Sequence, residues 1–303
     1  MEPAHGRIAQ KSVEYFNQAI EKDPNYALAY AALADAYQLI PEYHAGSPQE
    51  YSPRARAAAT KALSIDDSLA DAHAALSLVL WGYEWKFEEA RKALQRALAL
   101  NPNDPTIRHW NGENLVTIGK FDEGIAELKR AQDLDPLSLI INADLGEAYI
   151  WARQYDKAIE QLRKTIEMDQ SFYYAHWHLG LAYQLKGSYQ EAVAAYQKAR
   201  NLDDDPLVLA LLGQVYATSG KRDEALKLLD ELKQKAKQGY VTPFSFAVIY
   251  AGLGNRDQAF EWLEKCYQDR VSDLVHLKVD PLVDNLRSDA RFADLVKRVG
   301  LPQ

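Results

Sequence analysis

Cysteine is nearly absent from this sequence, with Cys266 as the one thiol among 303 residues. A single thiol excludes an intrachain disulfide and leaves the redox compartment open. Long apolar runs are also lacking: no stretch approaches the ~20 residues of a membrane-spanning helix, and no charged-then-apolar leader precedes Gly6. We therefore expect neither a membrane span nor a signal peptide. These absences favour a cytoplasmic protein, or a periplasmic one if the chain is a fragment of a membrane-anchored regulator.

Positive charge is the next deficit, with 35 Lys and Arg against 43 Asp and Glu and a net charge of −8. This balance favours solubility, and it argues against nucleic acid or an anionic membrane as the direct partner. Glycine and proline are sparse, whereas Ala, Leu, Glu, Lys and Gln are prominent. That composition is typical of an all-helical protein.

Motifs of catalytic and metal sites are incomplete wherever they begin to form. Residues 252–254, Gly-Leu-Gly, would close a helix instead of opening one after a strand, so we interpret them as a helix C-cap. His176 and His178 lie two apart on a helix and point about 200° apart, so they cannot chelate one metal ion. The aspartates at 203–205 lack the glycine and distal glutamate of a calcium loop, and Cys266 is expected to be an inert buried thiol. We predict no enzyme activity, no catalytic residues, no cofactor and no metal.

What the sequence does contain is a repeat. When residues 139–204 are laid over themselves at a shift of 34, Leu145-Gly146 falls on Leu179-Gly180 and Tyr149 falls on Tyr183. In each copy the matching positions recur at helical spacing along one face of a first helix and one face of a second. This period and pattern resemble the tetratricopeptide repeat (TPR) family, from about residue 12 to residue 271. The resemblance implies an all-α fold, an α-solenoid in which helix-turn-helix units stack as a right-handed superhelix.

The whole chain, 1–303, is predicted to form one array. A half repeat at 8–24 comes first, and a capping segment at 272–303 comes last. Between them lie seven repeats, at 27–69, 70–104, 105–138, 139–172, 173–205, 206–239 and 240–271. Because the array opens in mid-repeat, we infer that the chain is a fragment of something longer. The two helices of a repeat should cross closely at Gly180, where a side chain would be overpacked.

Two stretches depart from the repeat. The first repeat has about nine extra residues around 41–51, either a functional loop or a tolerated insertion, and its second helix should resume near Ser52 with Pro53 in first position. After residue 271 the pattern stops, and Asp280-Pro281 and Ser288-Asp289 predict two further helix starts. Basic residues such as Arg291 and Arg298 suit a polar cap on the array. This ending also resembles those of TPR arrays fused to bacterial kinases and winged-helix regulators.

In the TPR family the first helices line a concave groove. The positions of this chain that correspond to groove-facing residues are Asp35, Gln38, His109, Glu113, Glu147, Trp151, Tyr174, Trp177, Gln184, Gln214 and Phe244. The set is aromatic and acidic, which predicts a neutral or basic partner; for any one residue, packing between repeats is the alternative. Trp151 and Trp177 are expected to be partly open to water, as an apolar platform for a partner. The sites that would hold a chaperone's terminal carboxylate carry no Lys, Arg or Asn, so that mode of binding is not expected.

Two functions remain open. The first is a protein–protein interaction scaffold that binds a peptide or a helix of a partner in the groove. The second is the ligand-sensing domain of a bacterial signalling protein, a kinase or a winged-helix regulator, whose N-terminal module is missing from this sequence. The acidic, aromatic groove fits both.

Overall fold

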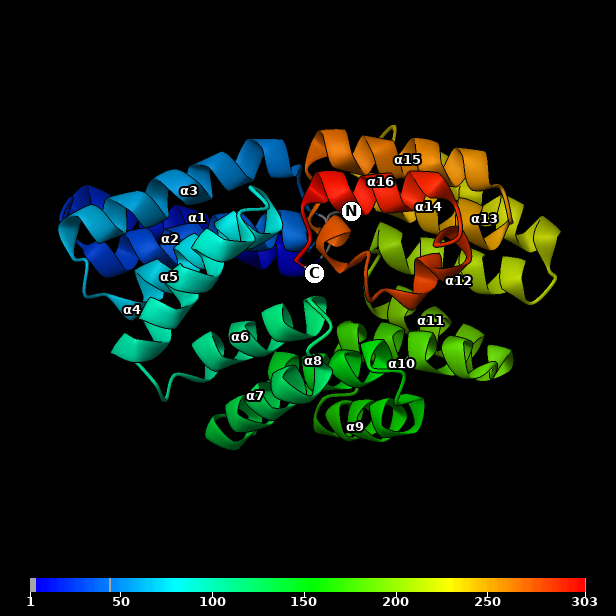
Figure 1. Ribbon diagram of the computed structural model, residues 1–303, viewed down its shortest axis with the longest axis horizontal. Coiled ribbons are helices and arrows are strands. Elements are labelled where there is room, and N and C mark those ends of the chain that lie inside the picture. The colour runs from blue at the N-terminus through cyan, green and yellow to red at the C-terminus, as the bar shows by residue number, and fades with distance from the viewer. Residues whose placement is uncertain (1–3, 44, 303) are drawn as a thin grey trace.

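The computed structural model describes residues 4–43 and 45–302, with side chains from residue 8 onward, and every regular element in that part of the chain is a helix (Figure 1). The elements are α1 (Ala4–Lys22), α2 (Ala27–Glu42), α3 (Pro48–Ile65), α4 (Ala70–Gly82), α5 (Phe87–Leu100), α6 (Pro105–Thr117), α7 (Phe121–Leu134), α8 (Leu139–Trp151), α9 (Tyr155–Met168), α10 (Tyr173–Lys186), α11 (Tyr189–Leu202), α12 (Pro206–Thr218), α13 (Arg222–Lys235), α14 (Pro243–Gly252), α15 (Arg256–Asp269), η1 (Ser272–His276), η2 (Pro281–Leu286) and α16 (Ala290–Val299). Neighbouring helices pack as pairs from α2–α3 to α14–α15, and α1 packs on α2. The prediction of an all-α solenoid is confirmed. Within the described ranges no helix is both long and apolar enough to cross a membrane.

Helix boundaries follow from local chemistry. The Asp104 carboxylate accepts hydrogen bonds from the backbone N–H of Thr106 and Ile107 and so caps α6, while Pro105 sets its first turn. At the other end of a helix, Gly187 takes the left-handed conformation (φ 86°) after α10. Such local signals, repeated along the chain, divide it into short helices of similar length.

First and second helices of the pairs differ in burial. A second helix such as α9 buries one face, through Ala158, Ile159, Leu162 and Thr165. The first helices α8, α10 and α12 are buried on nearly all sides. They touch their own partner helix, the next pair, and in part the C-terminal segment, so the first helices form the inner layer of the molecule.

The two helices of a repeat cross closely at Gly180, as the sequence predicts. A Cβ atom at this position would lie 2.7 Å from Cδ1 of Tyr196 on α11. In another repeat Gly112 and Gly124 face each other, and a Cβ on Gly124 would lie 2.7 Å from the Gly112 carbonyl oxygen. Glycine is needed at these crossings because the facing atoms leave no space for a methyl group.

The expected boundary in the first repeat is wrong. The second helix of that repeat begins at Pro48, not near Ser52, and Pro53 lies inside it. The preceding helix α2 continues through Pro41 to Glu42. The extra residues therefore lengthen the two helices and leave a short connection, in which His44 lies outside the described residues. Both prolines are compatible with the first turn of a helix. A start at Pro48 adds a turn of helix compared with a start at Pro53, and this is the start that the structure shows.

The C-terminal segment has two parts. Both predicted helix starts are confirmed, since Asp280 caps η2 at Leu282 and Asp289 caps α16 at Arg291. Helix α16 lies along α15, and Arg291 and Arg298 pair across with Asp257 and Glu264. The 3-10 helices η1 and η2 leave the stack and run across the concave side of the solenoid, which the repeat pattern did not indicate.

The two ends of the array meet, because the arc of helix pairs curves round until the last residues of α15 approach the first residues of α3 (Figure 1). The Arg270 guanidinium lies 4.3 Å from the ring centre of Trp85, and the Gln49 side chain donates to the Asp269 carboxylate at 3.1 Å. Trp85 and Arg270 both have left-handed backbones, with φ 56° and 55°. Contacts between residues about 200 positions apart thus close the solenoid into a ring.

Candidate functional site

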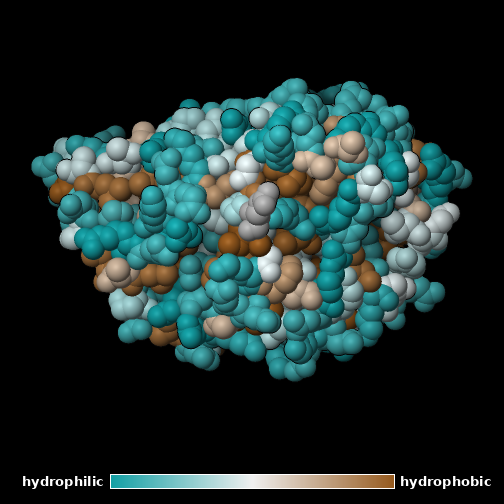
Figure 2. All heavy atoms as spheres, viewed as in Figure 1, coloured by the Kyte–Doolittle hydropathy of each residue, from teal (hydrophilic) through white to brown (hydrophobic). Residues whose placement is uncertain are grey.

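A cavity of about 210 Å³ lies on the inner side of this ring. Its walls come from first helices α2, α4, α6, α8, α10 and α12, and η1 covers it on one side. The space-filling view shows apolar side chains gathered in the middle of the face seen in Figure 1, where the C-terminal segment crosses (Figure 2). The cavity is lined by Gln38, Leu39, Glu42, Tyr43, Leu78, Trp81, Gly82, His109, Trp110, Glu113, Asn114, Thr117, Ile140, Asp144, Glu147, Trp151, Tyr174, Trp177, Leu207, Ser272, Asp273, Val275 and His276.

Carboxylates and imidazoles meet in this cavity. His109 Nε2 lies 2.7 Å from Asp144 Oδ2 and 3.3 Å from Glu113 Oε1. His109 and Glu113 are one turn apart on α6, while Asp144 comes from α8 in the next repeat. One turn further along α8, Glu147 Oε1 lies 3.1 Å from His178 Nε2 on α10. Three successive first helices therefore supply one polar cluster.

Burial and mutual repulsion shift the pKa values of these groups. Loss of solvation, followed by the Glu113 charge, raises the pKa of Asp144 to about 7 and that of Glu147 to about 8. Burial alone would lower the pKa of His109, but Glu113 and Asp144 raise it to about 10. At neutral pH the Glu113 carboxylate is therefore balanced by the His109 imidazolium, while Asp144 and Glu147 hold protons for part of the time. A cation that enters the cavity would favour the ionised form of these two carboxyl groups.

Two further histidines line or adjoin the cavity in the neutral form. Burial lowers the pKa of His178 and of His276 to about 4. His178 stacks on Trp177 with ring centres 3.5 Å apart, and the ring centre of His276 lies 4.3 Å from that of Trp151. His276 belongs to η1, so the chain's own C-terminal segment covers the indole of Trp151.

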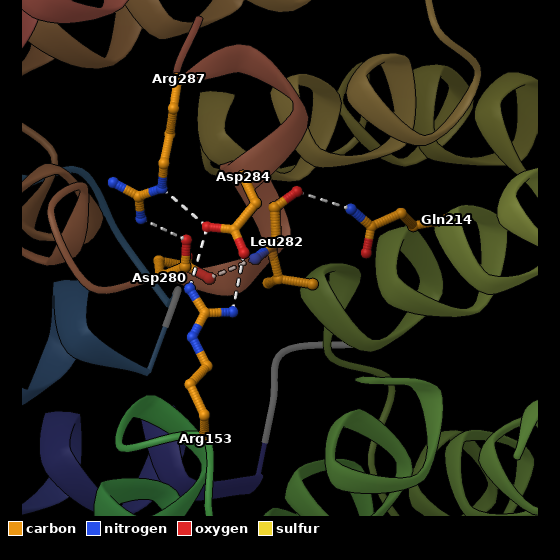
Figure 3. A network of polar contacts seen from close by, with 6 residues as sticks. All are labelled: Arg153, Gln214, Asp280, Leu282, Asp284 and Arg287. Carbon is orange, nitrogen blue, oxygen red and sulfur yellow. Dashed lines mark hydrogen bonds and ion pairs between the residues drawn. The ribbon is translucent and has the colours of Figure 1, made fainter. Parts of the chain in front are cut away.

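Polar contacts fasten the C-terminal segment over the concave face (Figure 3). Arg153 forms two hydrogen bonds with the Asp284 carboxylate, at 2.7 and 3.0 Å, and Arg287 donates to the same carboxylate at 2.7 Å. Gln214 Nε2 donates to the carbonyl oxygen of Leu282 at 3.0 Å. Arg153, in the turn after α8, and Gln214, on the first helix α12, thereby hold the segment by its Asp284 side chain and its main chain, much as a groove holds a peptide.

The structure divides the predicted groove residues into two sets. One set lines the cavity: Gln38, His109, Glu113, Glu147, Trp151, Tyr174 and Trp177. The other set, Asp35, Gln184, Gln214 and Phe244, lies outside it. Gln184 and Phe244 are buried, and Gln184 is hydrogen-bonded to Gln214. In Asp35 burial, with the Asp71 charge, raises the carboxyl pKa well above its usual value.

The expectation that Trp151 and Trp177 are partly open to water is wrong. Their exposed fractions are 7% and 9%, similar to that of the core residue Leu179. Trp151 is covered by His276, and Trp177 packs edge-on against Tyr174 at 5.3 Å as well as stacking on His178. Both indoles contribute only an edge to the cavity wall, because neighbouring side chains of the same chain cover most of each ring.

Sequence reasoning did not identify Asp144 and His276 as members of this cluster. Asp144 lies three residues before Glu147 on the same helix, so spacing alone would place both near one face of α8. Glu113 and Glu147 occupy equivalent positions 34 residues apart, which marks the acidic wall. For His276 there was no comparable signal, since it lies beyond the last repeat.

Comparison with family models agrees with the helix pairs and their stacking. Models described as "Tetratricopeptide repeat" match residues 86–138 and 143–206, 208–239, and 244–268. The chain is a tetratricopeptide repeat protein. TPR domains are typically protein–protein interaction modules, and the family is generally not catalytic. No comparison supports a fusion to signalling regulators.

Solved structures similar to this TPR protein show the fold alone, at low sequence identity. Human IFIT1, in a structure of its dimer with PPP-AAAA, is 16% identical with a TM-score of 0.67, over 97% of this chain and 68% of that one. Cut9, in the Cut9–Hcn1 hetero-tetramer of the APC/C, is 16% identical with a TM-score of 0.62, over 95% and 52%. A TPR protein from Thermus thermophilus is 23% identical with a TM-score of 0.52, over 55% and 92%. The search of curated proteins found no match.

Proposed function

We propose that this TPR protein is an interaction scaffold whose concave cavity takes a neutral or basic side chain from a segment of a partner protein. The observation that carries the proposal is the wall formed by Glu113, Asp144 and Glu147, against which His109 is the one positively charged group of the cluster. A cationic group from a partner would favour the ionised form of Asp144 and Glu147 and pair with them.

The aromatic and main-chain environment supports the same proposal. Trp110, Tyr174 and the edges of Trp151 and Trp177 give the cavity apolar contact area beside the carboxylates. The C-terminal segment, held at Leu282 and Asp284, is an example of the chain contact that these helices can make. An anionic ligand would face the carboxyl groups of the cavity wall, so direct nucleic-acid binding is not proposed.

The proposal is tested with three fluorescent peptides of equal length that differ only in carrying Lys, Gln or Glu at the same positions. We expect affinity to fall in that order, and the affinity of the Lys peptide to fall further with added salt. Glu147→Gln should reduce the preference for Lys over Glu. Glu123→Gln, on the outer helix α7, removes the same charge away from the cavity and should leave the preference unchanged.

Two results would contradict the scaffold. If the Glu peptide bound best, the cavity wall would not be the contact surface. If no peptide bound while small organic cations did so with the same dependence on Glu147, the cavity would serve a small ligand, as in the sensing hypothesis.

A further inference from the structure

The donor atoms of His109, Glu113 and Asp144 lie at distances that suit a shared metal ion. His109 Nε2 is 2.7 Å from Asp144 Oδ2 and 3.3 Å from Glu113 Oε1, and one donor atom from each of the three residues lies within 4.8 Å of the others. Nitrogen and oxygen ligands bound at about 2.0–2.2 Å to one ion lie about 3–3.6 Å apart in tetrahedral or octahedral geometry. Small side-chain rotations are therefore enough to direct all three atoms at one point. A metal ion bound there replaces the proton that His109 Nε2 shares with the two carboxyl groups, and that proton leaves to solvent.

The three side chains also come from rigid elements. His109 and Glu113 share one face of α6, and Asp144 is on α8, which packs beside α6 in the inner layer. Sites built on helices hold their ligands more precisely than sites on loops. The cavity of about 210 Å³ leaves room for water or another ligand on the remaining coordination positions.

Unsatisfied polar atoms point to a ligand that the three residues alone do not supply. Asp144 is 3% exposed, and its Oδ1 has no hydrogen-bond partner among the described residues. Gln38, which lines the same cavity from α2, is 7% exposed, and within the described chain its Oε1 is likewise without a partner. Buried oxygens in this state are costly unless an ion, or a water bound to one, satisfies them.

We propose that His109, Glu113 and Asp144 bind one divalent first-row transition-metal ion, for which Zn²⁺ is the probe. An imidazole nitrogen among the donors favours such an ion over Mg²⁺ or Ca²⁺, which prefer oxygen ligands only. Three protein ligands with open positions on the cavity side describe a site that can also take a ligand from outside the chain.

The metal site does not depend on the scaffold proposal, although both involve the same carboxyl groups. A metal ion and a basic side chain are attracted by the same carboxylates, so Zn²⁺ should compete with the Lys peptide. The metal titration contains no peptide, and the peptide assay is run with a chelator. Either idea can thus fail while the other stands.

The test is calorimetric titration of the full chain, after treatment with chelator, with ZnCl₂. One ion should bind per chain. Asp144→Asn and Glu113→Gln keep the side-chain shape and should weaken that binding by at least the ~10–100-fold typical of losing an outer-shell partner. His73→Ala is the matched control, because His73 is bound to the Asp67 carbonyl at a solvent-exposed site outside the cavity and should leave binding unchanged.

Circular dichroism establishes that each variant remains folded. If Asp144→Asn fails to fold, the Zn²⁺ affinity of Glu113→Gln alone tests the proposal, because the Glu113 side chain is 34% exposed and less needed for packing. The Co²⁺-loaded protein should show visible absorption bands that Glu113→Gln alters. The proposal is overturned if no saturable site is found, if Mg²⁺ binds as tightly as Zn²⁺, or if the two cavity variants bind Zn²⁺ as the wild type does.

Discussion

Burial determines both the protonation state of the side chains around the cavity and their contribution to the free energy of unfolding. Burial keeps His178 and His276 neutral, whereas His109 is held as a cation between Glu113 and Asp144. The same exclusion of water makes an aromatic residue such as Trp177 part of the core, although the repeat pattern predicts it to be partly open to water. At the scale of single residues, position in the repeat therefore does not fix the role of a side chain.

Trp177→Ala should be as damaging as the truncation of a core leucine. The indole stacks on His178 and packs edge-on against Tyr174, so its removal should lower the free energy of unfolding by ~3–5 kcal/mol. Leu179→Ala, at the same exposed fraction of 9%, is the comparison and should cost ~2–5 kcal/mol. Urea denaturation measures both. A loss below ~0.5 kcal/mol for Trp177→Ala would mean that the indole is exposed in solution.

Gly180→Leu should destabilise the protein even though leucine is the better helix former. A Cβ at this position already lies 2.7 Å from Tyr196, so a larger side chain must separate α10 from α11, at a cost of ~1–3 kcal/mol. Gly239→Leu is the control, because its Cβ would have no neighbour within 4 Å in the described chain. Thermal unfolding should separate the two variants. Equal melting temperatures would contradict the close crossing.

At the scale of elements, the C-terminal segment should be held mainly by its apolar residues. Leu286, at the end of η2, is fully buried, and Leu286→Ala should cost ~2–5 kcal/mol. Asp284 forms ion pairs with Arg153 and Arg287, but its side chain is 41% exposed, so Asp284→Ala should cost no more than ~1 kcal/mol. Chemical denaturation of the two variants checks this order. The reverse order would show that the ion pairs anchor the segment.

Asp280 should make the segment sensitive to pH. Burial, with lesser contributions from the Asp273 and Glu147 charges, raises its pKa to about 7 from the ordinary value of 3.8, although the Leu282 N–H and Arg287 oppose the shift. The folded state then binds more protons than the unfolded chain between these values. The stability that Asp280 contributes is full below the unfolded pKa and is lost as the pH rises through the folded pKa.

Asp280→Asn removes this titration while the amide oxygen still accepts from the Leu282 N–H. Relative to wild type, the variant should gain ~1–3 kcal/mol in the free energy of unfolding between about pH 5 and pH 8. Urea denaturation at several pH values follows that difference. A difference that does not change with pH would place the Asp280 carboxyl in water.

Regular elements could be predicted from the sequence because their causes are local. The glycine at 187 and the capping aspartates at 280 and 289 act within a few residues of the helix ends they determine, and the 34-residue period repeats such local signals along the chain. The cavity could be predicted only in part. Glu113 and Glu147 recur with the repeat, but Arg153 and Asp284 meet across 131 positions, and periodicity carries no information about such pairs.

At the scale of the whole molecule, closure of the ring should affect shape more than stability. Arg270→Gly removes the stack of the guanidinium on Trp85, and at a desolvated site the loss of such a stack lowers the free energy of unfolding by ~2 kcal/mol. Glycine also relieves the strain of the left-handed backbone at this position, which raises the free energy of unfolding by a similar amount. We therefore expect a change in the free energy of unfolding within ~1 kcal/mol and a larger radius of gyration by small-angle scattering.

A matched control for this variant is Arg291→Ala. Arg291 stacks on Phe260 at 4.2 Å, a comparable contact that lies within the C-terminal part of the ring. Its loss should leave the radius of gyration unchanged. Equal expansion of both variants, or of neither, would show that the Trp85 contact does not hold the two ends together.

Closure also restricts how this array can change over evolutionary time. An open solenoid can lengthen or shorten by duplication or deletion of a repeat, because each unit needs only its neighbours. Here the pairs Gln49–Asp269 and Trp85–Arg270 set the length of the arc. A repeat inserted between the two ends would still stack on its neighbours. It would also move α15 away from its contacts with the N-terminal helices, and the cavity would then be uncovered. The number of repeats is therefore as much a determinant of the cavity as any side chain that lines it.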